Sequence, residues 1–134
     1  TKKFLLLQRN HVKQKGQWGL VGGTNEKYES PWEGLQREIQ EEIGSLPKFY
    51  KVFPLELFVS NDENFNFHTY LCFVDKEFMP KLNSEHSGYC WVDFGIWPKP
   101  LHQGLHNTLN NAIIKTKIMT AVDVMQFIEE SDDS

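Results

Sequence analysis

The sequence contains little cysteine and no long apolar run. Its two cysteines, Cys72 and Cys90, form no C-x-x-C pair, which argues against a disulfide scaffold and favours a reducing compartment. No apolar stretch approaches the roughly 20 residues that a membrane-spanning helix needs. No secretory signal pattern opens the chain as given. These absences predict a cytoplasmic protein without a membrane partner.

Basic residues are also not in excess. Asp and Glu number 18 against 14 Lys and Arg, which gives a formal net charge of -4. A protein without a basic field holds duplex nucleic acid poorly, so we expect no duplex partner. With 134 residues, 40% of them hydrophobic, the chain has the composition of one globular domain, residues 1–134. Because the chain opens inside a predicted strand, we expect a few residues to precede it.

Several local signals predict a helix over residues 31–43. Ser30 is a typical N-cap, Pro31 suits the first helical position, and Glu33 completes a capping box. Gly44 follows the last periodic residue, where a left-handed C-cap is common. Apolar residues recur at helical spacing and predict a buried stripe: Trp32, Leu35, Ile39 and Ile43.

The remaining pattern predicts strands before and after this helix. Apolar runs and period-two alternation indicate strands at residues 1–8, 18–21, 49–60, 65–73 and 89–94. Pro54 marks an edge or a bend in its strand. Helical spacing returns near residues 105–113 and again over 120–128, before an acidic tail at 131–134 that we expect to fray. This order predicts an α/β fold with a mixed β-sheet between helices.

Three glutamates share one face of the predicted helix. Glu38, Glu41 and Glu42 stand at i, i+3 and i+4. A solvated acidic face is the ordinary explanation for such a triplet. However, this face lies about 100° from the apolar stripe, so it can line a cleft at the edge of the core. Glycines 22 and 23 also allow backbone carbonyls to approach an ion. Such oxygen ligands suit Mg²⁺ or Mn²⁺.

Two arginines are candidates for binding negative charge. Arg37 stands four residues before Glu41, and it can bind that carboxylate or reach back to Glu29. Arg9 ends the first predicted strand. It is either a contact for a phosphate group or an ordinary surface arginine, and the sequence leaves both readings open.

The run from Gly23 to Ser45 resembles the Nudix box of the Nudix hydrolases, G-x5-E-x7-R-E-U-x-E-E-x-G-U, in which U is aliphatic. Every charged and glycine position of that signature is present, and the one departure is Ser45 in place of the last aliphatic residue. The segment from Trp18 to Gly23 is similar to the W-x-L-P-G-G that precedes the box, with Val21 replacing proline. The resemblance covers the chain from about residue 3 to about residue 97.

The resemblance implies a fold and an activity. The fold is a Nudix α/β/α sandwich, with helix 31–43 on one side of a mixed sheet and a C-terminal helix on the other. The activity is Mg²⁺-dependent hydrolysis of the diphosphate linkage in a nucleoside diphosphate joined to another moiety. ADP-ribose, dinucleoside polyphosphates, nucleotide sugars and nucleoside triphosphates remain open. The alternatives are an RNA 5′-end pyrophosphohydrolase and a catalytically silent nucleotide-binding module. A homodimer is compatible with the resemblance.

The resemblance also implies roles for individual residues. The metal ligands are the carbonyl of Gly22 and the carboxylates of Glu38, Glu41 and Glu42. Glu38 alternatively accepts the proton of the attacking water. Arg37 and Glu29 orient the metal-binding glutamates. Glu85, in the loop before a Trp-containing strand, is either a metal ligand, the base or a solvated loop residue.

Overall fold

The structure is a computed structural model that describes residues 2–22, 28–45, 47–59 and 66–132. The chain divides into two compact units, Thr1–Lys48 with Val74–His106, and Phe49–Phe73 with Asn107–Ser134. Gly23 of the resemblance and the turn predicted at 61–64 lie outside the described residues. Because the contacts divide the chain into two units, the single domain predicted for residues 1–134 stays a prediction.

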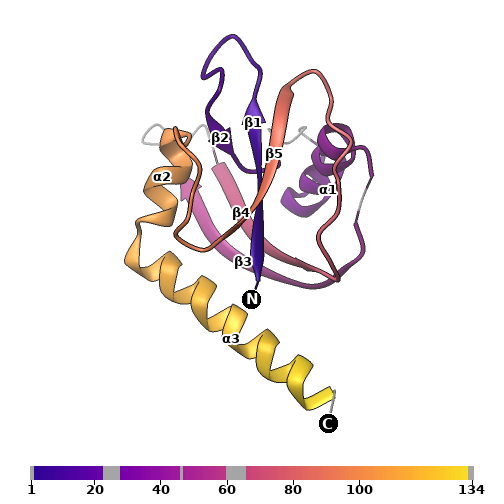
Figure 1. The fold of residues 1–134 in the computed structure, drawn as a ribbon, viewed down its shortest axis with the longest axis vertical. Coiled ribbons are helices and arrows are strands. Elements are labelled where there is room, and N and C mark those ends of the chain that lie inside the picture. Colours follow the sequence, from indigo (N-terminus) through magenta and orange to yellow (C-terminus); the bar gives the residue numbers. More distant parts are fainter. Residues whose placement is uncertain (1, 23–27, 46, 60–65, 133–134) are drawn as a thin grey trace. The chain divides into compact units, whose positions relative to one another are not determined.

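The first unit contains a three-stranded sheet in the order β2-β1-β5 (Figure 1). The central strand β1 (Lys3–Arg9) is antiparallel to both β2 (Trp18–Gly19) and β5 (His86–Asp93). Its apolar run supplies Leu6 and Leu7, which are fully buried. A parallel bridge joins Trp18 to Leu101. Strand β5 begins before the predicted residue 89, and this earlier start brings its first residues to the site described below.

Helix α1 (Pro31–Ile43) has the predicted bounds. The Ser30 hydroxyl accepts a hydrogen bond from the backbone N–H of Glu33 at 3.2 Å, and Pro31 occupies the first turn. The predicted stripe is buried at Ile39 and Ile43 and half-buried at Trp32 and Leu35. Local capping therefore sets both ends of the helix, and the buried stripe holds it in the unit.

The end of α1 is joined to a distant loop. Gly44 caps the helix with φ +84°, and its N–H donates to the carbonyl of Gln40. The N–H of Lys81 donates to the carbonyl of Ile43 at 3.0 Å. A Cβ at position 44 would lie 2.8 Å from the Cβ of Lys81. Glycine is therefore required here both by the backbone conformation and by the close approach of the loop.

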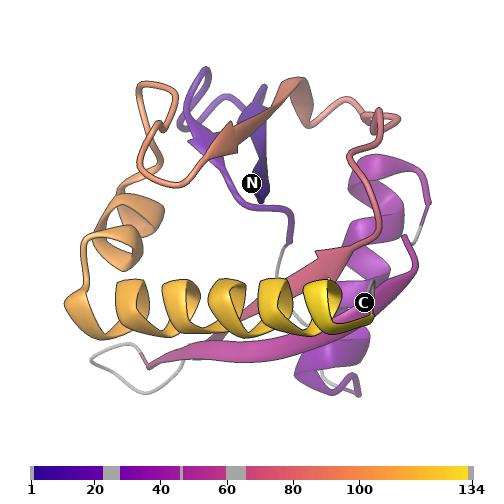
Figure 2. The same ribbon diagram turned by 60° about the horizontal axis from the view of Figure 1, so that its bottom comes forward.

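The second unit consists of a two-stranded sheet and a long helix. Strands β3 (Phe49–Val59) and β4 (Asn66–Val74) pair, and helix α3 (Ala112–Asp132) lies along β3 (Figure 2). Phe73, Ala121 and Met125 form one buried cluster in this unit. Pro54 lies inside β3. Each strand of a two-stranded sheet has one edge without a neighbouring strand, and there a proline, which has no N–H to donate, is tolerated.

The C-terminal helices differ from the prediction. Helical spacing was expected to continue through 105–113, with a separate helix at 120–128, but the structure has α2 (Gln103–Leu109) followed by one long α3. The side chain of Asn111 accepts hydrogen bonds from the N–H groups of Ile113 and Ile114, so it caps a new helix where apolar spacing continues across the break. Residues 131 and 132 of the predicted acidic tail are the last two residues of α3.

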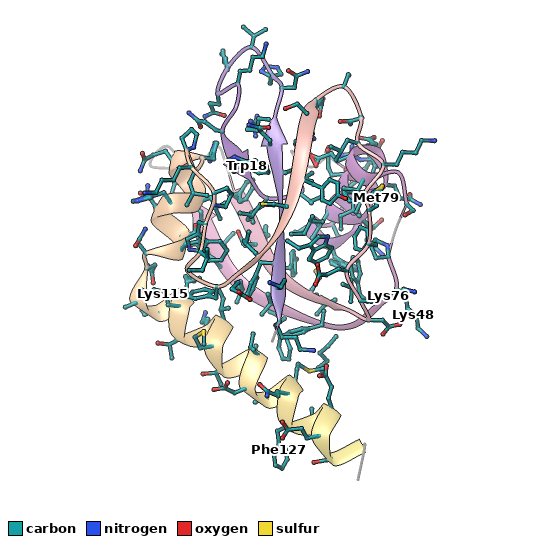
Figure 3. All side chains as sticks on the ribbon, viewed as in Figure 1. Trp18, Lys48, Lys76, Met79, Lys115 and Phe127 are labelled. Atoms are coloured by element: carbon teal, nitrogen blue, oxygen red, sulfur yellow. The ribbon has the colours of Figure 1, made fainter. Side chains whose placement is uncertain are left out.

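Helix α3 is buried on one side only. Phe127 is 70% exposed and projects from the helix (Figure 3). Among the described residues, no helix has both the length and the apolar character needed to cross a membrane.

We predict that Gly44→Ala destabilises the protein more than Gly95→Ala. Both glycines have positive φ, +84° and +91°, but no atom lies within 4 Å of a Cβ built at position 95. The backbone strain of about 1 kcal/mol is therefore common to both variants, and only Gly44→Ala adds a collision with Lys81. Urea unfolding of both variants measures the difference. Equal losses would show that the approach of the loop does not restrict position 44.

Candidate functional site

Arg37 of α1 binds three carboxylates at once. Its Nε and Nη2 donate to the two oxygens of Glu29 at 2.7 and 3.1 Å, and its Nη1 donates to Glu38 at 2.9 Å and to Glu41 at 3.2 Å. The bonds to Glu29, then those to Glu38 and Glu41, raise the pKa of the guanidinium further above its usual value, so it is always charged. Both contacts proposed for Arg37 from the sequence, with Glu41 and with Glu29, are present.

Glu42 is a buried carboxylate, 3% exposed. One of its oxygens accepts the backbone N–H of Gly22 at 2.8 Å. Burial raises its pKa from the ordinary 4.5 to about 8; the bond from Gly22 opposes this shift, whereas the negative charges of Glu38 and Glu85 add to it. A cation next to Glu42 would favour the ionised form. The structure thus places the predicted ligands Gly22 and Glu42 side by side.

His86, the first residue of β5, faces Glu42 inside the unit. Its Nε2 lies 3.9 Å from Oε1 of Glu42, and its side chain is only 6% exposed. Burial lowers the pKa of His86, which favours the neutral imidazole, and the neighbouring Glu85 opposes that shift. Sequence reasoning missed His86 because the strand was expected to begin later. Extending the period-two pattern back from Trp91 could have included His86 in the strand, but its place in the site depends on a β-bulge between β1 and β5.

A short loop fixes Glu85 near these groups. The side chain of Asn83 donates to the carbonyl of Glu41 at 3.0 Å and accepts the N–H of Glu85 at 3.1 Å. The N–H of Asn10 donates to the carbonyl of Glu85 at 2.8 Å. Glu85 is exposed to solvent, yet its backbone is bonded between the end of α1 and the end of β1. Its role as ligand or base stays a prediction.

All the predicted site residues that the structure describes lie in the first unit: Gly22, Glu29, Arg37, Glu38, Glu41, Glu42 and Glu85. Within the described residues, no three His, Cys, Asp or Glu side chains are arranged to hold a metal ion. Glu38 and Glu41 both accept hydrogen bonds from Arg37 instead. The donor types nevertheless fit Mg²⁺, because they are carboxylate and carbonyl oxygens and include a buried carboxylate that ionises reluctantly without a cation.

Comparisons with known proteins place the chain among related sequences and folds. A family model described as NUDIX domain matches residues 1–111. The dihydroneopterin triphosphate diphosphatase of Haemophilus influenzae is 33% identical over 107 residues, which cover 69% of this chain and 66% of that protein. The chain therefore spans about two thirds of the length of this relative.

Solved structures resemble the chain in fold. The Nudix hydrolase RenU of M. smegmatis has a TM-score of 0.69 at 20% identity, with 90% of this chain and 76% of that chain covered. The Ap4A hydrolase of C. elegans has a TM-score of 0.64 at 19% identity, with 89% and 87% covered. At such low identity these likenesses show the fold alone, and they confirm the predicted α/β/α fold class.

We predict that the metal-free protein loses stability as the pH rises from about 4.5 to about 8. In this range folded Glu42 retains a proton that the unfolded chain releases, so the stabilisation is complete below the unfolded pKa and is lost as the pH passes the folded one. The slope reaches at most about 1.4 kcal/mol per pH unit.

Urea unfolding of the wild type and Glu42→Gln, between pH 5 and 8.5, isolates this contribution. The difference between their profiles reports Glu42 together with the groups whose charges interact with it, among them His86 and Glu38. Parallel profiles would contradict the prediction.

Proposed function

Because the chain belongs to the NUDIX family, we propose that it hydrolyses the diphosphate linkage of a nucleoside diphosphate joined to another moiety, with Mg²⁺, or Mn²⁺ in its place. One observation carries the proposal. The buried carboxylate of Glu42 accepts a hydrogen bond from the N–H of Gly22. On the same helix, Arg37 forms ion pairs with Glu38 and Glu41. This acidic, partly buried surface suits a divalent cation together with a polyanion.

We assign each residue of the site a separate role in the proposed reaction. The carbonyl of Gly22 and the carboxylates of Glu38, Glu41 and Glu42 would hold the metal, which when bound would offset phosphate charge and activate water. Arg37 keeps two of these carboxylates in place, and Glu29 fixes Arg37 through a two-bond contact. Glu38 or Glu85 accepts the proton of the attacking water.

The substrate we propose is a phosphoanhydride, in the first place one derived from a nucleotide. The names of the relatives add dihydroneopterin triphosphate and Ap4A to the candidates. ADP-ribose, nucleotide sugars and nucleoside triphosphates complete the small-molecule set, and 5′-triphosphate RNA represents the alternative substrate. The presence of Arg37, Glu38, Glu41 and Glu42 favours an enzyme over a silent binding module.

We place this activity in the cytoplasm. Both cysteines are free thiols, and burial raises the pKa of Cys72 to about 11, so this thiol remains protonated and unreactive at neutral pH. A reducing compartment suits such a protein. A homodimer stays a prediction that sedimentation can test.

We predict that Glu42→Gln lowers kcat/KM by about 100-fold or more, because the amide cannot carry the negative charge that holds the metal. Glu33→Gln is the matched control: it makes the same chemical change on the exposed first turn of the same helix. It should stay within about twofold of the wild type, since no catalytic contact is lost. Product release over the substrate panel with Mg²⁺ measures both, and a chelator should abolish the activity.

Activity of Glu42→Gln within a few-fold of the wild type would reject the metal role of Glu42. No turnover of any substrate by folded, metal-bound protein would instead favour the nucleotide-binding module.

A further inference from the structure

The side chain of Asn83 bonds the loop that leads into β5 to the end of α1. An α-helix leaves its last four carbonyl groups without partners inside the helix. In α1 the carbonyl of Glu41 accepts a hydrogen bond from Nδ2 of Asn83 at 3.0 Å, and that of Ile43 accepts the N–H of Lys81 at 3.0 Å. The loop passes beside the helix (Figure 1). Asn83 therefore attaches this loop to the turn of α1 that carries Glu41 and Glu42.

Asn83 also orients the residues that follow it in the chain. Its Oδ1 accepts the N–H of Glu85 at 3.1 Å, and its backbone carbonyl accepts the N–H of His86 at 3.3 Å. An asparagine side chain that bonds to the backbone two residues later forms an Asx turn, which sets the direction of the chain. The amide group that completes the helix end therefore also sets the backbone conformation at Glu85.

The backbone of Glu85 is bonded from β1 as well. The N–H of Asn10 donates to the carbonyl of Glu85 at 2.8 Å, and the side-chain amide of Asn10 donates to the carbonyl of Ser84 at 3.2 Å. Both backbone polar groups of Glu85 are thus used, although the residue is exposed to solvent. Surface loops are ordinarily less restrained than this. Such an arrangement suits a side chain whose position matters to a functional site.

The charge of Glu85 acts on two buried groups of the site. Burial has the largest effect on the pKa of Glu42 and on that of His86, and the negative charge of Glu85 acts to raise both. Interactions between charges weaken with distance and with solvent screening. The carboxylate of Glu85 therefore lies near Glu42, and a displacement of its loop would change the charge around the site.

We propose that Asn83 is a positioning residue, which fixes the carboxylate of Glu85 relative to the turn of α1 that carries Glu41 and Glu42. The inference rests on the proposed function, in which Glu85 is a candidate metal ligand or base. Loss of the Asn83 side chain would release the N–H of Glu85 and the carbonyl of Glu41 together. Glu85 would then keep its charge but lose its fixed place, so turnover would fall through Glu85 alone.

A double-mutant cycle tests whether Asn83 acts through Glu85. It compares kcat and KM of the wild type, Asn83→Ala, Glu85→Gln and the double variant, with a substrate that the wild type hydrolyses. We expect Asn83→Ala to lower kcat by about tenfold and to leave KM within about twofold, as loss of a group that orients a functional side chain does. In the Glu85→Gln background the same change should alter kcat by less than about twofold, because no carboxylate is left to position. Equal losses in both backgrounds would overturn the proposal, and so would an unchanged kcat in Glu85→Gln.

Asn111→Ala is the matched control for lost stability. The side chain of Asn111 accepts the N–H groups of Ile113 and Ile114 at the start of α3, in the second unit. Each variant loses an asparagine that bonds to the backbone at a helix end, so urea unfolding should show similar losses of stability. Only Asn83→Ala should lower kcat. An equal fall of kcat in Asn111→Ala would show general destabilisation and overturn the proposal.

Amide hydrogen exchange followed by NMR tests the positioning without requiring turnover. In Asn83→Ala the N–H of Asn10, which donates to the carbonyl of Glu85, should exchange about tenfold faster or more, although Asn10 itself is unchanged. The amide of buried Leu7, in the same strand as Arg9, should keep its wild-type rate. Unchanged exchange at Asn10 would show that Asn83 does not hold Glu85 in place.

Failure of the positioning role differs from failure of the proposed function. If the wild type hydrolyses a substrate and Glu42→Gln does not, but Asn83→Ala lowers kcat equally in both backgrounds, the function holds and the positioning role is wrong. If no substrate is hydrolysed but exchange at Asn10 rises in Asn83→Ala, Asn83 does hold Glu85 and the hydrolase activity is wrong.

Discussion

The candidate site depends on one guanidinium that binds three carboxylates. Glu38 and Glu41 repel each other on the same helix face, and Glu29 precedes the helix; Arg37 bonds to all three. Most of this network is only partly exposed, so solvent screens it less than a surface ion pair. Because Glu29 holds the guanidinium at two atoms, Arg37 has a fixed orientation and fixes Glu38 in turn. An acidic helix face is thereby kept ordered before any metal or substrate binds.

The second constraint is the attachment of a loop to the end of this helix. Lys81 bonds to the carbonyl of Ile43, Asn83 to that of Glu41, and the loop then continues into Glu85 and His86. Gly44 permits the approach because it has no Cβ. The helix end that presents Glu41 and Glu42 therefore also anchors the segment that approaches them from β5. The same contacts therefore cap the end of α1 and position the loop of Glu85 and His86 next to it.

The sequence predicted those features that local chemistry determines. Helix α1 has the expected bounds because its N-cap, its first-turn proline and its C-terminal glycine lie within a few residues of each other. The break before α3 was missed because apolar spacing continues across it, and the Asn111 cap is one side chain among several polar ones. His86 was missed for a non-local reason: its place in the site follows from a bulge between β1 and β5, and cross-strand register cannot be read from one strand alone.

The remaining feature is the balance of charge around Glu42. Burial and two neighbouring carboxylates disfavour its ionised form, whereas the hydrogen bond from the N–H of Gly22 and, to a smaller extent, the charge of Arg9 favour it. A divalent cation bound there would stabilise the ionised carboxylate. A bound metal would thus make this acidic surface attractive to a polyanion. A protein with an overall net charge of -4 can bind a nucleotide in this way, because the charge at the site differs from the charge of the whole chain.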